Sequence, residues 1–312
     1  MKKSLTALAT IAILAAPHAM AEGKSYKVGS FDSIEVDGAI KVIHKTGSQT
    51  SVVVETPSGD YSDAKITSSG DTLKVSRESL GKKAGWFSWG GRSVSVSDDG
   101  KTIKVNGKKV PAYTVYVTSP ELVSVSAAQT SRFESQTIKA DAFSASVSSS
   151  SDIVIAGTVG SADLDASSSG EMDASGLKAG TVKADASSSG ALKAAATGTG
   201  QNRISVSSSG DVTLTSGGAG AFTVNASSGA SAKLSGACES INVMASSGAS
   251  VDGTSLRCAK ATANASSGAD VELFASSSAS GDASSGAGIS FKGGPKEQDL
   301  SKSSGGSVSF SD

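Results

Sequence analysis

The sequence is poor in aromatic, charged and histidine residues. Of its 312 residues, 4% are aromatic, 18% are charged and two are histidine. This composition excludes a coiled coil, in which Ala, Glu, Lys, Leu and Arg make up about half of the chain, and it argues against an ordinary enzyme core of Leu, Ile and Phe. Disorder is also disfavoured, because the net charge is only −1 and 38% of the residues are hydrophobic.

The motifs of common enzyme and cofactor sites are also missing. The sequence has no G-x-S-x-G motif, and no Walker A or G-x-G-x-x-G motif between a strand and a helix. His44 is alone on an expected strand, which favours a structural role. Asp163 and Asp165 form a carboxylate pair, but a glycosidase also needs a cleft and a set separation between its carboxylates. Because the repeat also lacks the G-G-x-G-x-D calcium pattern, we predict no catalytic residues, no metal and no cofactor.

Residues 1–21 have the pattern of a bacterial signal peptide. Lys2-Lys3 gives a positive start, Leu5 to Ala16 is apolar, and Ala19-Met20-Ala21 fits an A-x-A cleavage site. The apolar stretch is too short to cross a bilayer as a helix, although an N-terminal membrane anchor is the alternative. No later segment is apolar enough for a transmembrane helix, so we expect an exported protein in the periplasm, on the cell surface or in the medium.

A short Ser-Gly unit recurs through the second half of the sequence. The unit, Ser-Ser-(Ser)-Gly, returns about every 19 to 20 residues, and apolar residues alternate with polar ones on both sides of it. Such alternation predicts half-buried strands, and the unit itself predicts a turn in which Gly adopts a positive φ. The glycines that end the unit are Gly170, Gly190, Gly210, Gly229, Gly248, Gly268 and Gly286.

The regular repeat predicts an all-β fold, a right-handed parallel β-solenoid of about 19 to 20 residues per coil over residues 121–312. One repeat contains two short strands, and a second Gly-rich turn such as Thr215–Gly220 is expected to close it. Outward positions should stack into columns along the axis, and a flexible Ser/Gly linker is the alternative. One expected column consists of Asp165, Asp185, Ser205, Asn225 and Asn264.

Residues 22–120 are richer in Val, Lys and aromatic residues and predict a less regular N-terminal β region. We expect either irregular early coils or a β cap, because the end coil of a solenoid exposes unpaired strand edges. Residues 80–110 have the character of an insertion, in which Asp99-Gly100 predicts a hairpin. The expected strands are Ser33–Val36, Ile40–His44, Ser51–Glu55, Thr72–Ser76, Val94–Ser97, Thr102–Val105 and Tyr113–Val117.

Several segments together resemble one known family. They are Gly29-Ser30-Phe31-Asp32-Ser33-Ile34, Gly38-Ala39-Ile40-Lys41-Val42, the Ser-Ser-Gly-Ala-Ser repeats at Ser227–Ser231 and Ser246–Ser250, and the ending Gly286-Ala287-Gly288 and Gly293-Gly294-Pro295. They resemble the head GIN domain family of autotransporter adhesin heads over residues 28–310. The sequence departs from the family at its name-giving motif, which reads Gly-Ala-Ile here, and at the insertion. The resemblance implies a β-solenoid outside the cytoplasm.

One segment of the insertion is a candidate ligand-binding loop. It contains both Trp residues of the chain, between glycines and next to basic residues. Such a loop suits a glycan, a component of the envelope or membrane surface, or a protein partner; the alternative is that the Trp side chains plug the end of the solenoid. A nucleic-acid partner is not expected for an exported protein of pI about 6.2. The candidate residues are Lys82, Lys83, Trp86, Phe87, Trp89 and Arg92.

The two cysteines occupy nearly equivalent places in consecutive repeats. Cys238 lies nine residues after Gly229, and Cys258 lies ten residues after Gly248. In-register residues on neighbouring strands are close enough for a disulfide, and export permits oxidation. We predict a disulfide between them; two buried free thiols are the alternative.

Together these features predict a non-enzymatic, exported β-solenoid that acts as an adhesin-like or envelope surface-binding protein. The alternatives are a carbohydrate-active enzyme on a β-helix and a periplasmic structural or scaffolding protein. A carboxylate cluster in a surface groove would favour the enzyme, and a periplasmic location would favour the scaffold. The sequence gives no prediction of oligomeric state.

Overall fold

The structure is a computed structural model that describes residues 23–81, 93–97 and 102–310. One short helix, α1 (Glu78–Gly81), lies among the described residues, and none of their helices is long and apolar enough to cross a membrane. The strands are β1 (Lys24–Tyr26), β2 (Ser33–Asp37), β3 (Lys41–Thr46), β4 (Ser51–Glu55), β5 (Ala64–Ser69), β6 (Thr72–Arg77), β7 (Val94–Val96), β8 (Ile103–Val105), β9 (Lys108–Val110), β10 (Thr114–Ser119), β11 (Ser124–Ala128), β12 (Arg132–Val147), β13 (Asp152–Ala166), β14 (Glu171–Ala186), β15 (Ala191–Ala196), β16 (Gln201–Val206), β17 (Asp211–Ser216), β18 (Ala221–Ala226), β19 (Ser231–Ala245), β20 (Ser250–Ala265), β21 (Asp270–Ala283), β22 (Gly288–Lys292), β23 (Glu297–Lys302) and β24 (Ser307–Phe310).

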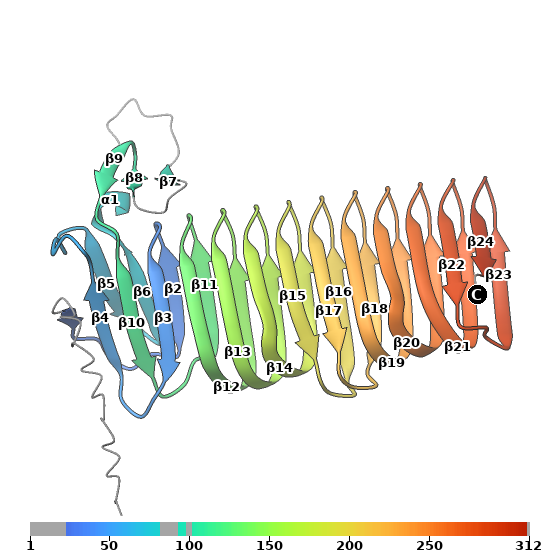
Figure 1. The fold of residues 1–312 in the computed structure, drawn as a ribbon, viewed down its shortest axis with the longest axis horizontal. Coiled ribbons are helices and arrows are strands. Elements are labelled where there is room, and N and C mark those ends of the chain that lie inside the picture. The colour runs from blue at the N-terminus through green and yellow to red at the C-terminus, as the bar shows by residue number, and fades with distance from the viewer. Residues whose placement is uncertain (1–22, 82–92, 98–101, 311–312) are drawn as a thin grey trace, which may run out of the picture.

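The chain winds into a β-solenoid of about nine turns (Figure 1). Its coils form two walls. The upstream sheet contains the strands that lead into the Ser-Gly turns: β6, β2, β11, the second halves of β12 to β14, β16, β18, the second halves of β19 to β21, and β23. The downstream sheet contains the strands that leave these turns. Neighbouring coils pair in parallel in both walls, so the predicted all-β solenoid is confirmed.

The corner opposite the Ser-Gly turns differs from the prediction. β12, β13, β14, β19, β20 and β21 pass through this corner as single strands of 14 to 16 residues. The register shifts at the bend, for example between Val154 and Ala156. A separate turn closes the repeat only between β15 and β16 and between β17 and β18 in the regular coils of β12 to β21. The second Gly-rich turn at Thr215–Gly220 is therefore an exception, because most coils bend a continuous strand instead.

The Ser-Gly turns use their residues in two ways. Ser168 and Ser169 have φ values of 50° and 61°, and the N–H of Gly170 donates to the carbonyl of Ser167 at 2.8 Å. Gly170 itself has no positive φ; a Cβ there would lie 2.8 Å from the carbonyl of Val147 in the preceding coil. In the later turns the glycine does take the positive φ, 69° at Gly229. The predicted role of glycine is thus right for Gly229 and wrong for Gly170, where close approach of two coils requires it.

The N-terminal coils are stacked out of sequence order. β2 lies between β6 and β11 in the upstream sheet, and β3 lies between β10 and β12 in the downstream sheet. Antiparallel strands close this end: β4 pairs with β10, β1 with β4, and β5 with β6. The region therefore contains both irregular coils and an antiparallel cap, the two arrangements that the sequence left open.

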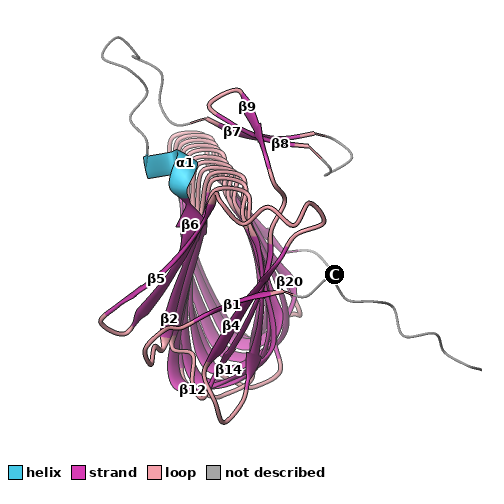
Figure 2. Cartoon of the chain, turned by 90° about the vertical axis from the view of Figure 1, so that its left-hand side faces the viewer, coloured by secondary structure: helices cyan, strands magenta, loops and turns pink. Residues whose placement is uncertain are grey.

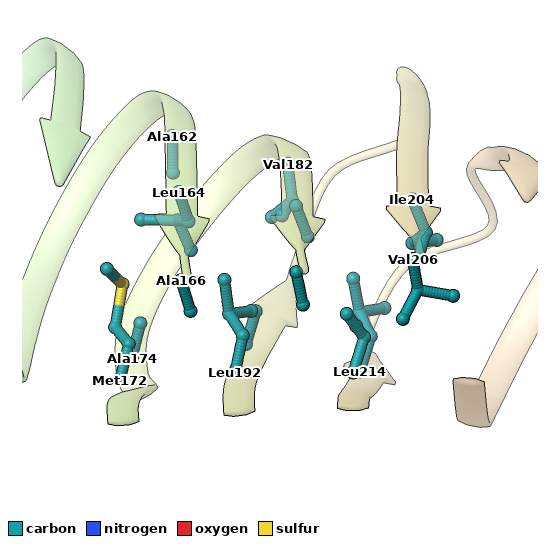
Figure 3. Close-up of a cluster of buried hydrophobic side chains, with 14 of the residues drawn as sticks. Ala162, Leu164, Ala166, Met172, Ala174, Val182, Leu192, Ile204, Val206 and Leu214 are labelled. Carbon is teal, nitrogen blue, oxygen red and sulfur yellow. The ribbon is translucent and has the colours of Figure 1, made fainter. Parts of the chain in front are cut away.

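Small side chains fill the narrow interior between the two walls. Leu164 and Ile204 from the upstream sheet project into the same interior as Met172 and Leu192 from the downstream sheet, with alanines between them (Figure 3). All four of these large side chains are buried. The small inward residues let the two walls approach closely. Protein interiors are close-packed, so little volume is left for a larger side chain.

Ala245→Leu is expected to lower the free energy of unfolding by about 1–3 kcal/mol. Ala245 lies in register with Ala226 and Ala265, and all three are buried, so the larger side chain has no space in its own or the neighbouring coils. Thermal or denaturant unfolding measures the effect. Met244→Leu on the same strand is the control, because Met244 is 49% exposed. An unchanged melting temperature for Ala245→Leu would show that this column does not face the core.

Candidate binding surfaces

The insertion replaces a Ser-Gly turn in one N-terminal coil. It leaves the solenoid after β6, returns at β10, and places α1 and the small sheet of β7, β8 and β9 beside the row of turns (Figure 2). Two of the sequence predictions lie outside the described residues. They are the expected hairpin turn at Asp99-Gly100 and the candidate ligand-binding residues Lys82, Lys83, Trp86, Phe87, Trp89 and Arg92.

Arg77, the last residue of β6, anchors the entry to the insertion. Its side chain is buried and donates hydrogen bonds to the carbonyls of Gly38 and Ala39 in the adjacent coil. It also forms an ion pair with Asp63, 3.1 Å from Nη1 to Oδ2. Asp63 accepts the backbone N–H of Ser79 at the start of α1, 2.8 Å away. A buried guanidinium needs such partners, so this network fixes where the insertion begins.

Tyr113 lies where the chain returns from the insertion to β10, and it contacts Arg77 and Asp63. The Arg77 guanidinium lies 4.9 Å from the centre of its ring. The Tyr113 hydroxyl donates to the carbonyl of Asp60 at 3.0 Å and accepts the N–H of Asp63 at 3.3 Å. Burial raises the pKa of Tyr113 to about 12, so the hydroxyl stays protonated and keeps its donor role. Both ends of the insertion are therefore fixed to the solenoid body through Asp63 and Arg77.

The small sheet presents lysines on its outer surface. Ile103 and Val105 of β8 are buried, whereas Lys104 of β8 and Lys108 and Lys109 of β9 are exposed. Lys104 lies directly opposite Lys109 across the antiparallel pair. Like charges opposite one another cost stability, so the pairing of Lys104 with Lys109 does not itself stabilise this sheet.

A turn that the sequence prediction did not include joins β8 to β9. Asn106 and Gly107 have φ values of 51° and 77°, as the favoured two-residue hairpin turn requires. The Asn-Gly pair is itself a hairpin signal, so a search of the insertion for such pairs would have identified β9.

The outer face of the upstream sheet is hollowed by grooves. The larger one, of about 620 Å³, crosses β11, β12, β13, β14 and β16 and is called the Arg203 groove here. A second groove of about 490 Å³ crosses β16, β18, β19, β20 and β21 around Met244. Its lining includes Ser205, Asn225 and Asn264 of the predicted outward column, which the strand register confirms. Short polar side chains dominate the lining of the groove around Met244.

Charges gather at one place in the Arg203 groove. Lys183 Nζ lies 3.1 Å from Asp163 and 3.1 Å from Asp185, and Arg203 follows Lys183 on the next strand. Burial, followed by the neighbouring charge of Asp185, raises the pKa of Asp165. Asp163 is the carboxylate that lines this groove, and its two oxygens both contact Lys183. The predicted pair of Asp163 and Asp165 thus lies beside a groove, which the sequence did not reveal.

His44 has a structural environment. Its Nδ1 lies 2.9 Å from Ser135 Oγ and its Nε2 lies 3.0 Å from Ser119 Oγ. Since Ser119 Oγ donates to the carbonyl of Glu121 at 2.7 Å, the ring donates from Nε2 and accepts at Nδ1. Burial lowers the pKa of His44 to about 4, so the neutral ring holds the end of β10 where the chain crosses to β11.

Cys238 and Cys258 lie directly opposite one another on β19 and β20. The structure joins them in a disulfide with Cα atoms 4.5 Å apart, and both side chains are buried. The described residues contain no group of three or more His, Cys, Asp and Glu side chains arranged to hold a metal ion.

The fold and these surfaces define a β-solenoid scaffold that carries an anchored insertion and a grooved polar face. A family model described as "Putative auto-transporter adhesin, head GIN domain" matches residues 30–219 and 198–295. The chain therefore belongs to the head GIN domain family, as its sequence motifs indicated.

Solved structures that match this chain include proteins from two Parabacteroides species. A protein titled "Putative lipid binding protein" from Parabacteroides distasonis is 16% identical, with a TM-score of 0.42; 93% of this chain and 96% of that chain are covered. A "putative adhesin" from the same species is 15% identical, with the same coverage and a TM-score of 0.46. One from Parabacteroides merdae is 15% identical, covers 93% and 95%, and has a TM-score of 0.46. Among curated proteins, no match is found.

Proposed function

We propose that this protein is exported and acts as a non-enzymatic, adhesin-like binding protein of the cell surface or envelope. Residues 1–21 would serve as the leader, and the solenoid would be a rigid support for the insertion. The anchored insertion carries the proposal: it is tied to the body at both ends through Arg77, Asp63 and Tyr113. A rigidly based element with exposed like charges is more suited to contacting a partner than to stabilising the fold.

The insertion has the chemistry of a contact surface for a glycan, an envelope component or a protein. Lys104, Lys108 and Lys109 are exposed on the small sheet, and the sequence adds both Trp residues and further cations to the same insertion. Aromatic and cationic side chains supply most of the energy at binding surfaces. Family membership supports the same role, because the family is described as an adhesin head.

Replacing both Trp86 and Trp89 by Ala is expected to abolish binding of the partner that the insertion contacts and to leave the fold intact. The measurement is binding of the purified protein to a glycan array and to intact cells, with circular dichroism as the check of folding. Tyr116→Ala is the matched control, because Tyr116 is an exposed aromatic residue of the solenoid body and its loss should leave binding unchanged. Unfolding of the double variant would show instead that the Trp side chains are part of the core or of a cap.

Location separates this proposal from a periplasmic scaffold. Fractionation of cells that express the tagged protein, followed by protease treatment of intact cells, shows whether the protein reaches the surface. Protection from protease, together with recovery from the periplasm, would contradict a surface role. Turnover of a polysaccharide by the purified protein would contradict the non-enzymatic role.

A further inference from the structure

The Arg203 groove follows the long axis of the solenoid. One line of its lining residues is Ser144, Asp163, Lys183 and Arg203, which are in register on β12, β13, β14 and β16. Strands in a sheet lie about 4.8 Å apart, so the four positions span about 14 Å. A ligand that matches this groove is a chain with a short repeat, not a single small molecule.

The two cations of the groove, Lys183 and Arg203, differ in their carboxylate partners. Lys183 is neutralised by two carboxylates, since its Nζ contacts both Asp163 and Asp185. Arg203 is exposed, and no carboxylate among the described residues lies within ion-pair distance of it. A guanidinium has five N–H donors in a planar fork that matches a carboxylate with two parallel hydrogen bonds. The groove therefore presents one free site for a carboxylate at its end on β16.

The rest of the lining suits a sugar. Ser144, Thr181 and Gln201 offer hydroxyl and amide groups, and the half-buried Val123 and the exposed Ala142 add apolar surface. Polar groups beside apolar surface match a pyranose ring, which has hydroxyls at its rim and C–H groups on its faces. An acidic peptide fits less well, because peptides bind sheets by pairing with an exposed edge strand, and this groove crosses a face whose strands are paired on both sides.

We propose that the Arg203 groove binds an acidic polysaccharide, with a hexuronate carboxylate on the Arg203 guanidinium and the sugar chain along the solenoid axis. The site is separate from the insertion, so this proposal does not depend on the binding role proposed for the insertion. Lys183 holds Asp163 in place on one side of the groove, and the hydroxyl-bearing side chains contact the rims of the sugar rings.

The test is calorimetric titration of the purified protein with oligomers of galacturonate, glucuronate and mannuronate, and with their carboxyl-reduced, neutral counterparts. At least one acidic oligomer should bind, and its neutral counterpart should bind at least about tenfold more weakly. Arg203→Gln should weaken binding by about tenfold or more, and Arg203→Lys should restore only part of it, because an ammonium lacks the fork geometry.

Lys233→Gln is the matched control. Lys233 is an exposed cation of the downstream sheet, so its replacement makes the same change in net charge and should leave binding unchanged. Absence of binding to all three acidic oligomers at millimolar concentration would overturn the proposal, as would equal binding by Arg203→Gln or by the neutral oligomers. Equal binding of poly-glutamate would show a general anion surface instead of a saccharide site.

Discussion

Reduction of the Cys238–Cys258 disulfide is expected to lower the free energy of unfolding by about 3 kcal/mol. The bond joins two residues that are 20 positions apart and directly opposite one another on β19 and β20. It closes a loop of about one coil. In the chain-entropy model, a cross-link across a loop of that size lowers the conformational entropy of the unfolded chain and so stabilises the folded state by about 3 kcal/mol. Denaturant unfolding with and without reductant gives the difference directly.

The double variant Cys238→Ala/Cys258→Ala is the control for the reductant itself. Alanine fits these positions because in-register neighbours in the interior are themselves small, as Ala275 beside Cys258 shows. The variant should be as unstable as the reduced protein and should not respond to reductant. Titration of two free thiols in the unfolded, unreduced protein would contradict the disulfide and favour buried thiols.

Acidification from pH 7 to pH 4 is expected to remove about 3 kcal/mol of stability through His44 alone. Burial lowers the pKa of His44 in the folded protein to about 4, against about 6.5 for the exposed side chain. Between these values the unfolded chain binds a proton that the folded chain does not, so the free energy of unfolding falls as the pH is lowered. Most of the loss lies between pH 6.5 and pH 4.

His44→Gln isolates this contribution. The variant should be less stable at pH 7, because Gln cannot reproduce both ring contacts to Ser119 and Ser135, but its stability should change less with pH. Asp152 and Asp165, whose pKa values are raised by burial, titrate in both proteins and cancel in the comparison. Parallel curves of unfolding free energy against pH for the two proteins would contradict a neutral, buried His44.

The spacing of the Ser-Gly unit and the alternation around it were enough to predict the solenoid. They define which residues face inward, and Ala226 and Ala245 are buried as the alternation requires. The two roles of glycine in the turns were not predicted, although they follow the length of the unit: Gly229 ends a unit that is one residue shorter and takes the positive φ that Ser169 takes before Gly170. The continuous strands through the second corner were missed because single glycines mark several of these bends, such as Gly157 and Gly236 with positive φ, and no Gly-rich segment stands there.

The candidate surfaces were predicted less completely than the fold. Asp163 is recognisable as one of a carboxylate pair, but its groove arises from three-dimensional register with Lys183 and Arg203, each 20 residues from the next. The anchor of the insertion joins Arg77 to Asp63 and to the carbonyl of Ala39, contacts that no periodicity connects. Short-range patterns describe repeated coils well and describe single, long-range contacts poorly.

The out-of-order stacking at the N-terminal end has a consequence for the order in which the chain folds. β2 and β3 gain their neighbours on both sides only when they meet β6, β10, β11 and the start of β12, so they depend on residues more than eighty positions later in the chain. Contacts of such sequence separation are slow to form. Each regular coil, in contrast, needs only the coil before it as a template. Assembly should therefore begin with one slow, all-or-none step up to Arg132 and continue as rapid addition of single coils toward the C-terminus.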